Sequence, residues 1–173
     1  MLSDLSGVDV VVAPPFTALT AVASVLKNGP MALAAQNLFW EEKGAFTGEI
    51  APAMIKDAGC AYVIIGHSER RQFFHETDET VNRRLKSALK VSLVPIVCIG
   101  ETLAEREADK TFSIIERQIR SGLIDLSLDE IGRVIIAYEP VWAIGTGKTA
   151  TPEQAQEVHG FIRRLIAQLI SRE

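Results

Sequence analysis

Five short apolar runs, separated by stretches long enough for a helix, constrain the fold of this chain more than any other feature of its sequence. The runs are apolar at consecutive positions, which is typical of strands covered on both faces. Alternation of such strands with helical stretches predicts an α/β fold with a parallel sheet built from βα units. The predicted strands are Val8–Ala13, Met31–Ala35, Tyr62–Ile65, Leu93–Ile99 and Val134–Tyr138.

Two of the intervening stretches carry clear helix signals. In the stretch after Thr77 the apolar residues recur on one helical face. The last stretch combines Thr151 as N-cap, Pro152 as the first helical residue and Gln154 at the position that completes a capping box. The expected core residues of these two helices are Val81, Leu85, Ala88 and Leu89, and Val158, Ile162, Leu165, Ile166 and Leu169.

Length, charge and cysteine usage exclude several classes of function. The 173 residues suffice for one domain, which we expect to span residues 1–173. A net charge of −4 leaves no basic face for a nucleic acid, and no apolar stretch reaches the length of about 18 residues that a membrane span requires. The N-terminus does not have the features of a signal peptide, and Cys60 and Cys98 lie in apolar runs typical of buried thiols in a reducing compartment. We therefore expect a cytoplasmic protein.

A histidine directly follows the third predicted strand. In parallel α/β folds, ligands bind at the carboxyl ends of the strands, which is where His67 lies. The alternative is a histidine that caps the strand and is satisfied by the backbone, with Ser68 and Glu69 simply beginning a helix.

A glutamate directly follows the fifth predicted strand and precedes a loop bounded by Gly145 and Gly147. A glutamate and a histidine on the same rim can act as an acid–base pair, and a glycine-rich loop can offer N–H groups to an anionic substrate. The alternative is that Glu139 is buried and paired with an arginine, under a loop packed by Trp142.

The two segments resemble the signature segments of the triosephosphate isomerase family. The matching stretches, which follow one another in unbroken order, are Ala13–Phe16, Ala35–Asn37, Gly44–Glu49, Ile65–Arg71, Cys98–Glu101 and Ala137–Gly147. The resemblance covers essentially all 173 residues. It implies a (β/α)8 TIM barrel that is incomplete in this chain, with about five parallel strands and intervening helices.

The same resemblance implies roles for individual residues. Glu139 would be the base that moves a proton between two carbons of a triose phosphate, and His67 the neutral group that hydrogen-bonds the developing enediolate. Gly145 would donate its backbone N–H to the substrate phosphate. Ser68 and Glu69 match positions beside the site without a role as proton carriers. No metal and no organic cofactor are implied.

Thr47 matches the tip of a loop that, in this family, reaches into the active site of a neighbouring subunit. The resemblance therefore implies a homodimer. Three aromatic side chains of this loop are expected to be exposed, which favours their burial in a partner. They are Phe39, Trp40 and Phe46.

The sequence departs from the family in length, since a complete barrel has eight strands and about 250 residues. The first strand, which carries an asparagine and a lysine of the family's site, and the last two strands, which help to grip the phosphate, are not recognisable. Residues 1–6 resemble the end of a helix and residues 170–173 an unfinished one. Two hypotheses follow: a part of an active isomerase, completed by a longer or second chain, or an inactive partial barrel or self-associating module.

Overall fold

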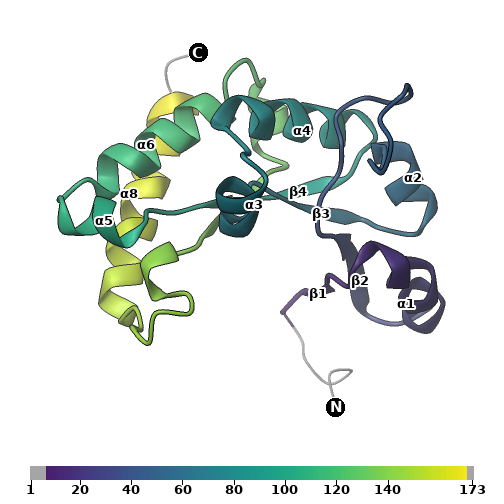
Figure 1. Ribbon diagram of the computed structural model, residues 1–173, viewed down its shortest axis with the longest axis horizontal. Coiled ribbons are helices and arrows are strands. Elements are labelled where there is room, and N and C mark those ends of the chain that lie inside the picture. The colour runs from purple at the N-terminus through teal and green to yellow at the C-terminus, as the bar shows by residue number, and fades with distance from the viewer. Residues whose placement is uncertain (1–6, 171–173) are drawn as a thin grey trace. The chain divides into compact units, whose positions relative to one another are not determined.

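The described residues of the computed structural model, 7–170, form five strands in one sheet, in the order β1-β2-β3-β4-β5 (Figure 1). The parallel pairing places Val10 of β1 opposite Met31 of β2, and Ala34 of β2 opposite Tyr62 of β3. The five predicted strands and the α/β fold are thus confirmed, with several strand ends shifted by one or two residues. The strands are β1 (Val10–Val12), β2 (Met31–Ala35), β3 (Tyr62–Ile65), β4 (Val94–Ile99) and β5 (Ile135–Tyr138).

Helices lie between successive strands, and β5 is followed by α8. They are η2 (Phe16–Ala18), α1 (Leu19–Leu26), α2 (Pro52–Asp57), α3 (Ser68–Phe73), α4 (Asp78–Lys90), α5 (Leu103–Glu107), α6 (Thr111–Gly122), α7 (Leu128–Ile131), η3 (Val141–Ala143) and α8 (Pro152–Ile170). The predicted capping box of α8 is confirmed, since Thr151 N–H donates to Gln154 Oε1 at 2.9 Å and Gln154 N–H donates to Thr151 Oγ1 at 3.2 Å. None of the helices between residues 7 and 170 is long and apolar enough to cross a membrane.

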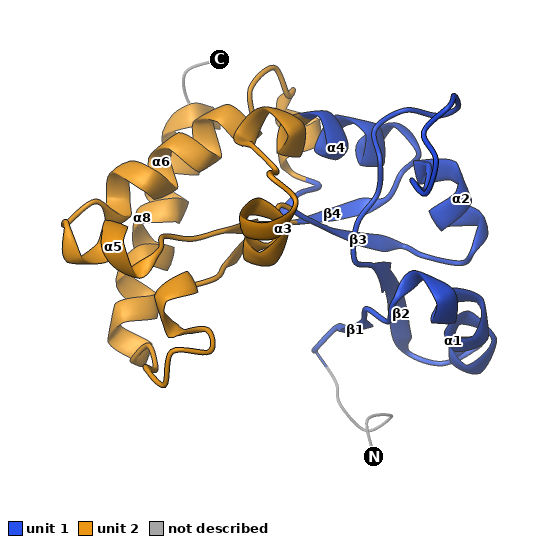
Figure 2. Ribbon diagram, in the orientation of Figure 1, with its two compact units in different colours: residues 1–65, 83–96, 133–135 blue, residues 66–82, 97–132, 136–173 orange. Residues whose placement is uncertain are grey.

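The chain divides into two compact units (Figure 2). Unit 1 comprises residues 1–65, 83–96 and 133–135, and its core includes Leu33, Ala34, Leu38, Ile55, Val63, Ile65, Leu85 and Leu93. Unit 2 comprises residues 66–82, 97–132 and 136–173, and its core includes Val81, Val97, Ile99, Ile115, Ile119, Val158, Ile162 and Leu165. The predicted apolar face of α4 is buried, whereas Ile166 and Leu169 of α8 are partly exposed. The single domain expected over residues 1–173 stays a prediction.

The outer strands differ from the prediction that both strand faces are covered. All three residues of β1 are partly exposed, and Ile135 at the start of β5 is 45% exposed. The inner strands β2, β3 and β4 each contain fully buried positions. The physical reason is position, because β1 and β5 are the two ends of the described sheet and each has one neighbouring strand.

The loop between β2 and α2 folds on its own aromatic side chains. The ring of Phe39 lies 4.2 Å from that of Trp40 and 4.7 Å from that of Phe46, measured between centroids. The guanidinium of Arg84 lies 4.8 Å from the Trp40 centroid. The prediction of three exposed aromatics is therefore wrong for Phe39 and Trp40, which are half-buried, whereas Phe46 is 42% exposed. Thr47 is exposed as well.

Candidate active site

His67 lies in the turn between β3 and α3. Gly66 makes this turn with a φ of +71°, a left-handed conformation that glycine adopts without strain. His67 then caps α3, because its Nδ1 accepts the N–H of Glu69 at 3.3 Å. A nitrogen that accepts a hydrogen bond carries no proton, so the neutral imidazole holds its proton on Nε2. The alternative of a histidine satisfied by the backbone is thus correct for Nδ1, whereas Nε2 has no backbone partner among the described residues.

Glu139 directly follows β5, and its N–H donates to the carbonyl of Ile99 at 2.8 Å. One carboxylate oxygen accepts from the Ser68 N–H at 3.0 Å. The other accepts from the Ser68 hydroxyl at 2.7 Å and lies 3.0 Å from His67 Nε2. The alternative of an arginine-paired glutamate is therefore wrong. Instead, the structure brings together the predicted residues His67, Ser68 and Glu139.

The remaining predicted residues lie at the edge of this group. The Glu69 carboxylate is exposed and lies 3.7 Å from His67 Nδ1, which is beyond hydrogen-bond distance. Nδ1 accepts the Glu69 N–H and therefore carries no proton in a neutral imidazole, so it has none to donate to the Glu69 carboxylate. Gly145 is exposed in the loop after β5 and has a φ of +67°.

Glu101, which sequence reasoning placed in a matching stretch without assigning it a role, anchors the start of that loop. Its side chain is 0% exposed and accepts from Trp142 Nε1 and Arg106 Nη1, each at 2.9 Å. It also accepts from the Tyr138 hydroxyl at 3.1 Å and from Thr111 at 3.3 Å. Burial and the neighbouring Glu101 raise the pKa of Tyr138 to about 12. The signal that could have revealed Glu101 is its place just after Gly100, close to the carboxyl end of an apolar strand.

Unit 2 also contains a cavity of about 900 Å³ beside this group. Ser68, Glu69, Val141, Trp142 and Thr146 are among the residues that line it. His67 and Glu139 are not in its lining, so the cavity adjoins these two residues without containing them. Its volume is in the range of small-molecule sites.

Both cysteines are free and buried, as predicted. Burial raises the pKa of the Cys60 thiol to about 11. Burial raises the pKa of Cys98 to about 12, with a further contribution from the nearby Glu139 and an opposing one from Arg71. Among residues 7–170, no group of three or more His, Cys, Asp or Glu side chains is arranged to hold a metal ion.

The raised pKa values of Cys60 and Cys98 predict that the folded chain loses stability in alkali. The unfolded chain ionises its thiols near pH 9, whereas the folded chain keeps Cys98 protonated up to about pH 12. The stability is therefore fully present below pH 9 and is lost as the pH rises toward 12. Urea unfolding under reducing conditions, below and above pH 9, measures this loss. We expect a smaller loss in Cys98→Ala, and an equal loss in that variant would contradict the assignment.

Comparison with known proteins matches the whole chain to one family. The whole chain, residues 1–173, matches the family model described as triosephosphate isomerase. The triosephosphate isomerase of Endomicrobium trichonymphae is 60% identical over 168 residues, which cover 97% of this chain and 67% of that protein. That of Geobacter metallireducens is 56% identical over 171 residues, which cover 99% and 68%.

The fold agrees as well. The crystal structure of triosephosphate isomerase from Bartonella henselae matches with a TM-score of 0.82 at 37% identity, covering 90% of this chain and 62% of that one. This chain thus spans about two thirds of the length of these relatives, and its five described strands compare with the eight of a complete barrel. The predicted incomplete TIM barrel is confirmed. Since the match to the family model extends over the entire chain, this chain belongs to the triosephosphate isomerase family.

Proposed function

We propose that this chain carries the acid–base pair of a triosephosphate isomerase, which interconverts dihydroxyacetone phosphate and glyceraldehyde 3-phosphate. The observation that carries the proposal is the 3.0 Å contact between His67 Nε2 and Glu139 Oε1. It brings a carboxyl group beside an imidazole nitrogen at the carboxyl ends of two strands of a TIM barrel. Proton transfer beside a carbonyl group needs both of these groups.

The reaction requires no oxidant or reductant. Glu139 takes a proton from the hydroxyl-bearing carbon next to the carbonyl, and the electron pair of that C–H bond forms the C=C bond of an enediolate. His67 Nε2–H replaces its contact with Glu139 by a hydrogen bond to the carbonyl oxygen, where negative charge develops. The carboxylic acid then returns its proton to the neighbouring carbon, and a proton moves between the two oxygens. The sum is an isomerisation.

The loop after β5 completes the proposed site. Gly145 offers its N–H to the substrate phosphate, and closure of residues 140–148 excludes water, in which the enediolate would lose its phosphate. Ser68 holds the carboxylate of Glu139 through two hydrogen bonds, while Glu69 orients His67 through its backbone N–H. Neither a metal nor an organic cofactor takes part in these steps.

The proposal extends to the partners and the setting of the protein. A second copy would receive the loop that carries Thr47, whose exposed Phe46 offers an apolar contact beside it. The protein would act in the cytoplasm, in glycolysis and gluconeogenesis, as a homodimer or together with a complementing chain. Size-exclusion chromatography with light scattering tests the dimer, and a Phe46→Ser variant that elutes like the unchanged chain would contradict this contact.

Deuterium exchange tests the chemistry of the 173-residue chain directly. The resemblance assigns a lysine and further phosphate loops to strands that are not among the five, so we expect little or no turnover of glyceraldehyde 3-phosphate. Loss of one such electrostatic stabiliser lowers a rate by about 10²- to 10³-fold. Proton abstraction alone should still be visible as slow incorporation of deuterium at the hydroxyl-bearing carbon of dihydroxyacetone phosphate in D₂O, followed by NMR.

The matched control is Glu139→Gln, which keeps the shape of the side chain but removes the base, and we expect it to abolish this exchange. Equal exchange in the unchanged chain and in Glu139→Gln would favour the second function, an inactive partial barrel or self-associating module. Near-normal turnover that Glu139→Gln abolishes would instead refute the expectation of low activity.

A further inference from the structure

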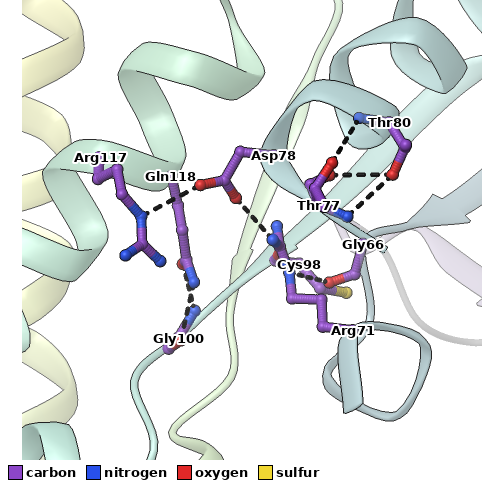
Figure 3. A network of polar contacts seen from close by, with 9 residues as sticks. All are labelled: Gly66, Arg71, Thr77, Asp78, Thr80, Cys98, Gly100, Arg117 and Gln118. Carbon is purple, nitrogen blue, oxygen red and sulfur yellow. Dashed lines mark hydrogen bonds and ion pairs between the residues drawn. The ribbon is translucent and has the colours of Figure 1, made fainter. Parts of the chain in front are cut away.

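Arg71 connects the segments at the ends of β3 and β4 (Figure 3). Its Nε donates to the carbonyl of Gly66 at 2.8 Å, and its Nη2 to the carbonyl of Cys98 at 3.4 Å. Gly66 is the residue directly before His67, and Cys98 lies near the end of β4. A planar guanidinium has donors in fixed directions, so these bonds restrict where the peptide group before His67 can lie.

Asp78, at the start of α4, holds this guanidinium in place. Asp78 Oδ1 accepts from Arg71 Nη1 at 2.6 Å, and Asp78 Oδ2 accepts from Arg117 Nε of α6 at 3.2 Å. Reciprocal bonds between Thr77 and Thr80 fix the first turn of α4 around Asp78 (Figure 3). The chain of contacts from His67 therefore ends on α6.

The next residue of α6 holds the other half of the pair. Gln118 Oε1 accepts the N–H of Gly100 at 2.9 Å, and Gln118 Nε2 donates to the carbonyl of Gly100 at 3.1 Å (Figure 3). Gly100 packs directly on the backbone of Glu139, whose carbonyl carbon lies 2.8 Å from the position of a Cβ built on Gly100. Gln118 thereby fixes the surface on which the Glu139 peptide rests.

We propose that Arg71 and Gln118 are positioning residues, which hold the peptide groups beside His67 and Glu139 on one support, helix α6, and so set the contact between the two side chains. Neither residue touches the reacting atoms in this proposal. The proposal rests on the proposed function only in linking this positioning to catalysis. The positions of the two side chains can be measured without substrate.

Arg70 provides a matched control for a merely structural role. It lies on the same helix, and its side chain is 22% exposed, against 19% for Arg71. It pairs with Glu76 and stacks on Phe74. A lysine keeps the charge at either position but not the planar fork of donors. Arg70→Lys and Arg71→Lys should therefore perturb stability similarly and differ in their effect on the site.

The experiment is NMR spectroscopy of the ¹⁵N-labelled 173-residue chain, at a pH where the imidazoles are neutral. Long-range ¹H–¹⁵N spectra report which ring nitrogen of His67 is protonated, with His75 and His159 as internal references. The chemical shift of the Ser68 amide, which donates to Glu139, reports the position of that carboxylate. The spectrum of Glu139→Gln gives the shift of this amide when the side chain at position 139 has no charge. Urea unfolding of each variant confirms that the spectra compare folded protein.

We expect His67 of the unchanged chain to be protonated on Nε2. In Arg71→Lys and Gln118→Leu, the fraction of His67 imidazoles protonated on Nδ1 should rise about threefold to tenfold. A change of this size corresponds to the net free energy of roughly one hydrogen bond. The Ser68 amide should move toward its position in Glu139→Gln. Asp78→Asn leaves the strand carbonyls untouched and should produce a smaller shift in the same direction, which keeps the test open if Arg71→Lys does not fold.

An unchanged His67 spectrum in Gln118→Leu and Asp78→Asn would overturn the proposal, as would an equal change in Arg70→Lys. If the spectra change as expected but the chain shows no deuterium exchange, the positioning roles of Arg71 and Gln118 are supported and only the proposed function is contradicted.

Discussion

Gly100→Ala should lower the free energy of unfolding by about 3 kcal/mol and disrupt the proposed acid–base pair, His67 and Glu139. A Cβ at this position would overlap the carbonyl oxygen of Glu139, and it would lie 2.8 Å from the carbonyl carbon. Both are backbone atoms, so no rotation of a flexible side chain can relieve the clash. The peptide of Glu139 must move, although its N–H is tied to Ile99 at 2.8 Å. A displacement of about 1 Å can cost about 10²-fold in rate.

Urea unfolding and the deuterium exchange described above measure the two effects. Gly160→Ala is the control, because Gly160 lies within α8 and the nearest atom to its built Cβ is the end of the Arg164 side chain at 3.4 Å. There the alanine should be neutral or stabilise the helix by up to about 1 kcal/mol. Comparable losses in the two variants would show that the backbone contact between Gly100 and Glu139 does not decide the outcome.

Glu101→Gln should have a similarly large effect, about 3 kcal/mol of lost stability. The variant keeps the size of the side chain but replaces a carboxylate oxygen with an NH₂ group, which cannot accept a hydrogen bond. The guanidinium of Arg106 and the indole N–H of Trp142 converge on one carboxylate oxygen, so at least one donor would lose a partner. The Arg106 charge would also lose its carboxylate. Urea unfolding followed by tryptophan fluorescence measures the change.

The matched control is Glu116→Gln, which makes the same chemical change in an ion pair on α6. Glu116 and Arg120 are both exposed, and such pairs contribute at most about 0.5 kcal/mol. We therefore expect a several-fold difference between the two variants. Similar small losses in both would mean that water reaches Glu101 and that burial does not strengthen its contacts.

Local patterns predicted much of the fold because their causes are local. The consecutive apolar residues of the strands and the pairing of Thr151 with Gln154 depend on near neighbours in the chain, and the structure contains these elements. The placement of His67 and Glu139 at strand ends also follows from local pattern, since carboxyl ends of parallel strands meet on one edge.

The missed contacts join residues far apart in the chain. Tyr138 and Trp142 meet Glu101 over 37 and 41 positions, and Arg117 meets Asp78 over 39. No propensity or spacing encodes such pairs, because helix packing decides which polar groups face each other. The exposed aromatics were mispredicted for a related reason, since Phe39 and Trp40 cover each other within a loop of no regular pattern.

The hydrogen bonds that Glu139 makes in the free site have a consequence for selectivity. Its carboxylate lies 3.0 Å from Nε2 of His67, so a ligand that binds between them gains only the difference between the contacts it forms and the contact it displaces. A ligand with a carbonyl oxygen at this place takes over the imidazole donor and loses little in the exchange. An analogue that placed a methylene group between the two side chains would separate them and leave the imidazole N–H without an acceptor, which is a strong basis for rejecting a ligand. The resting site would thus discriminate against analogues without a carbonyl group before any proton moves.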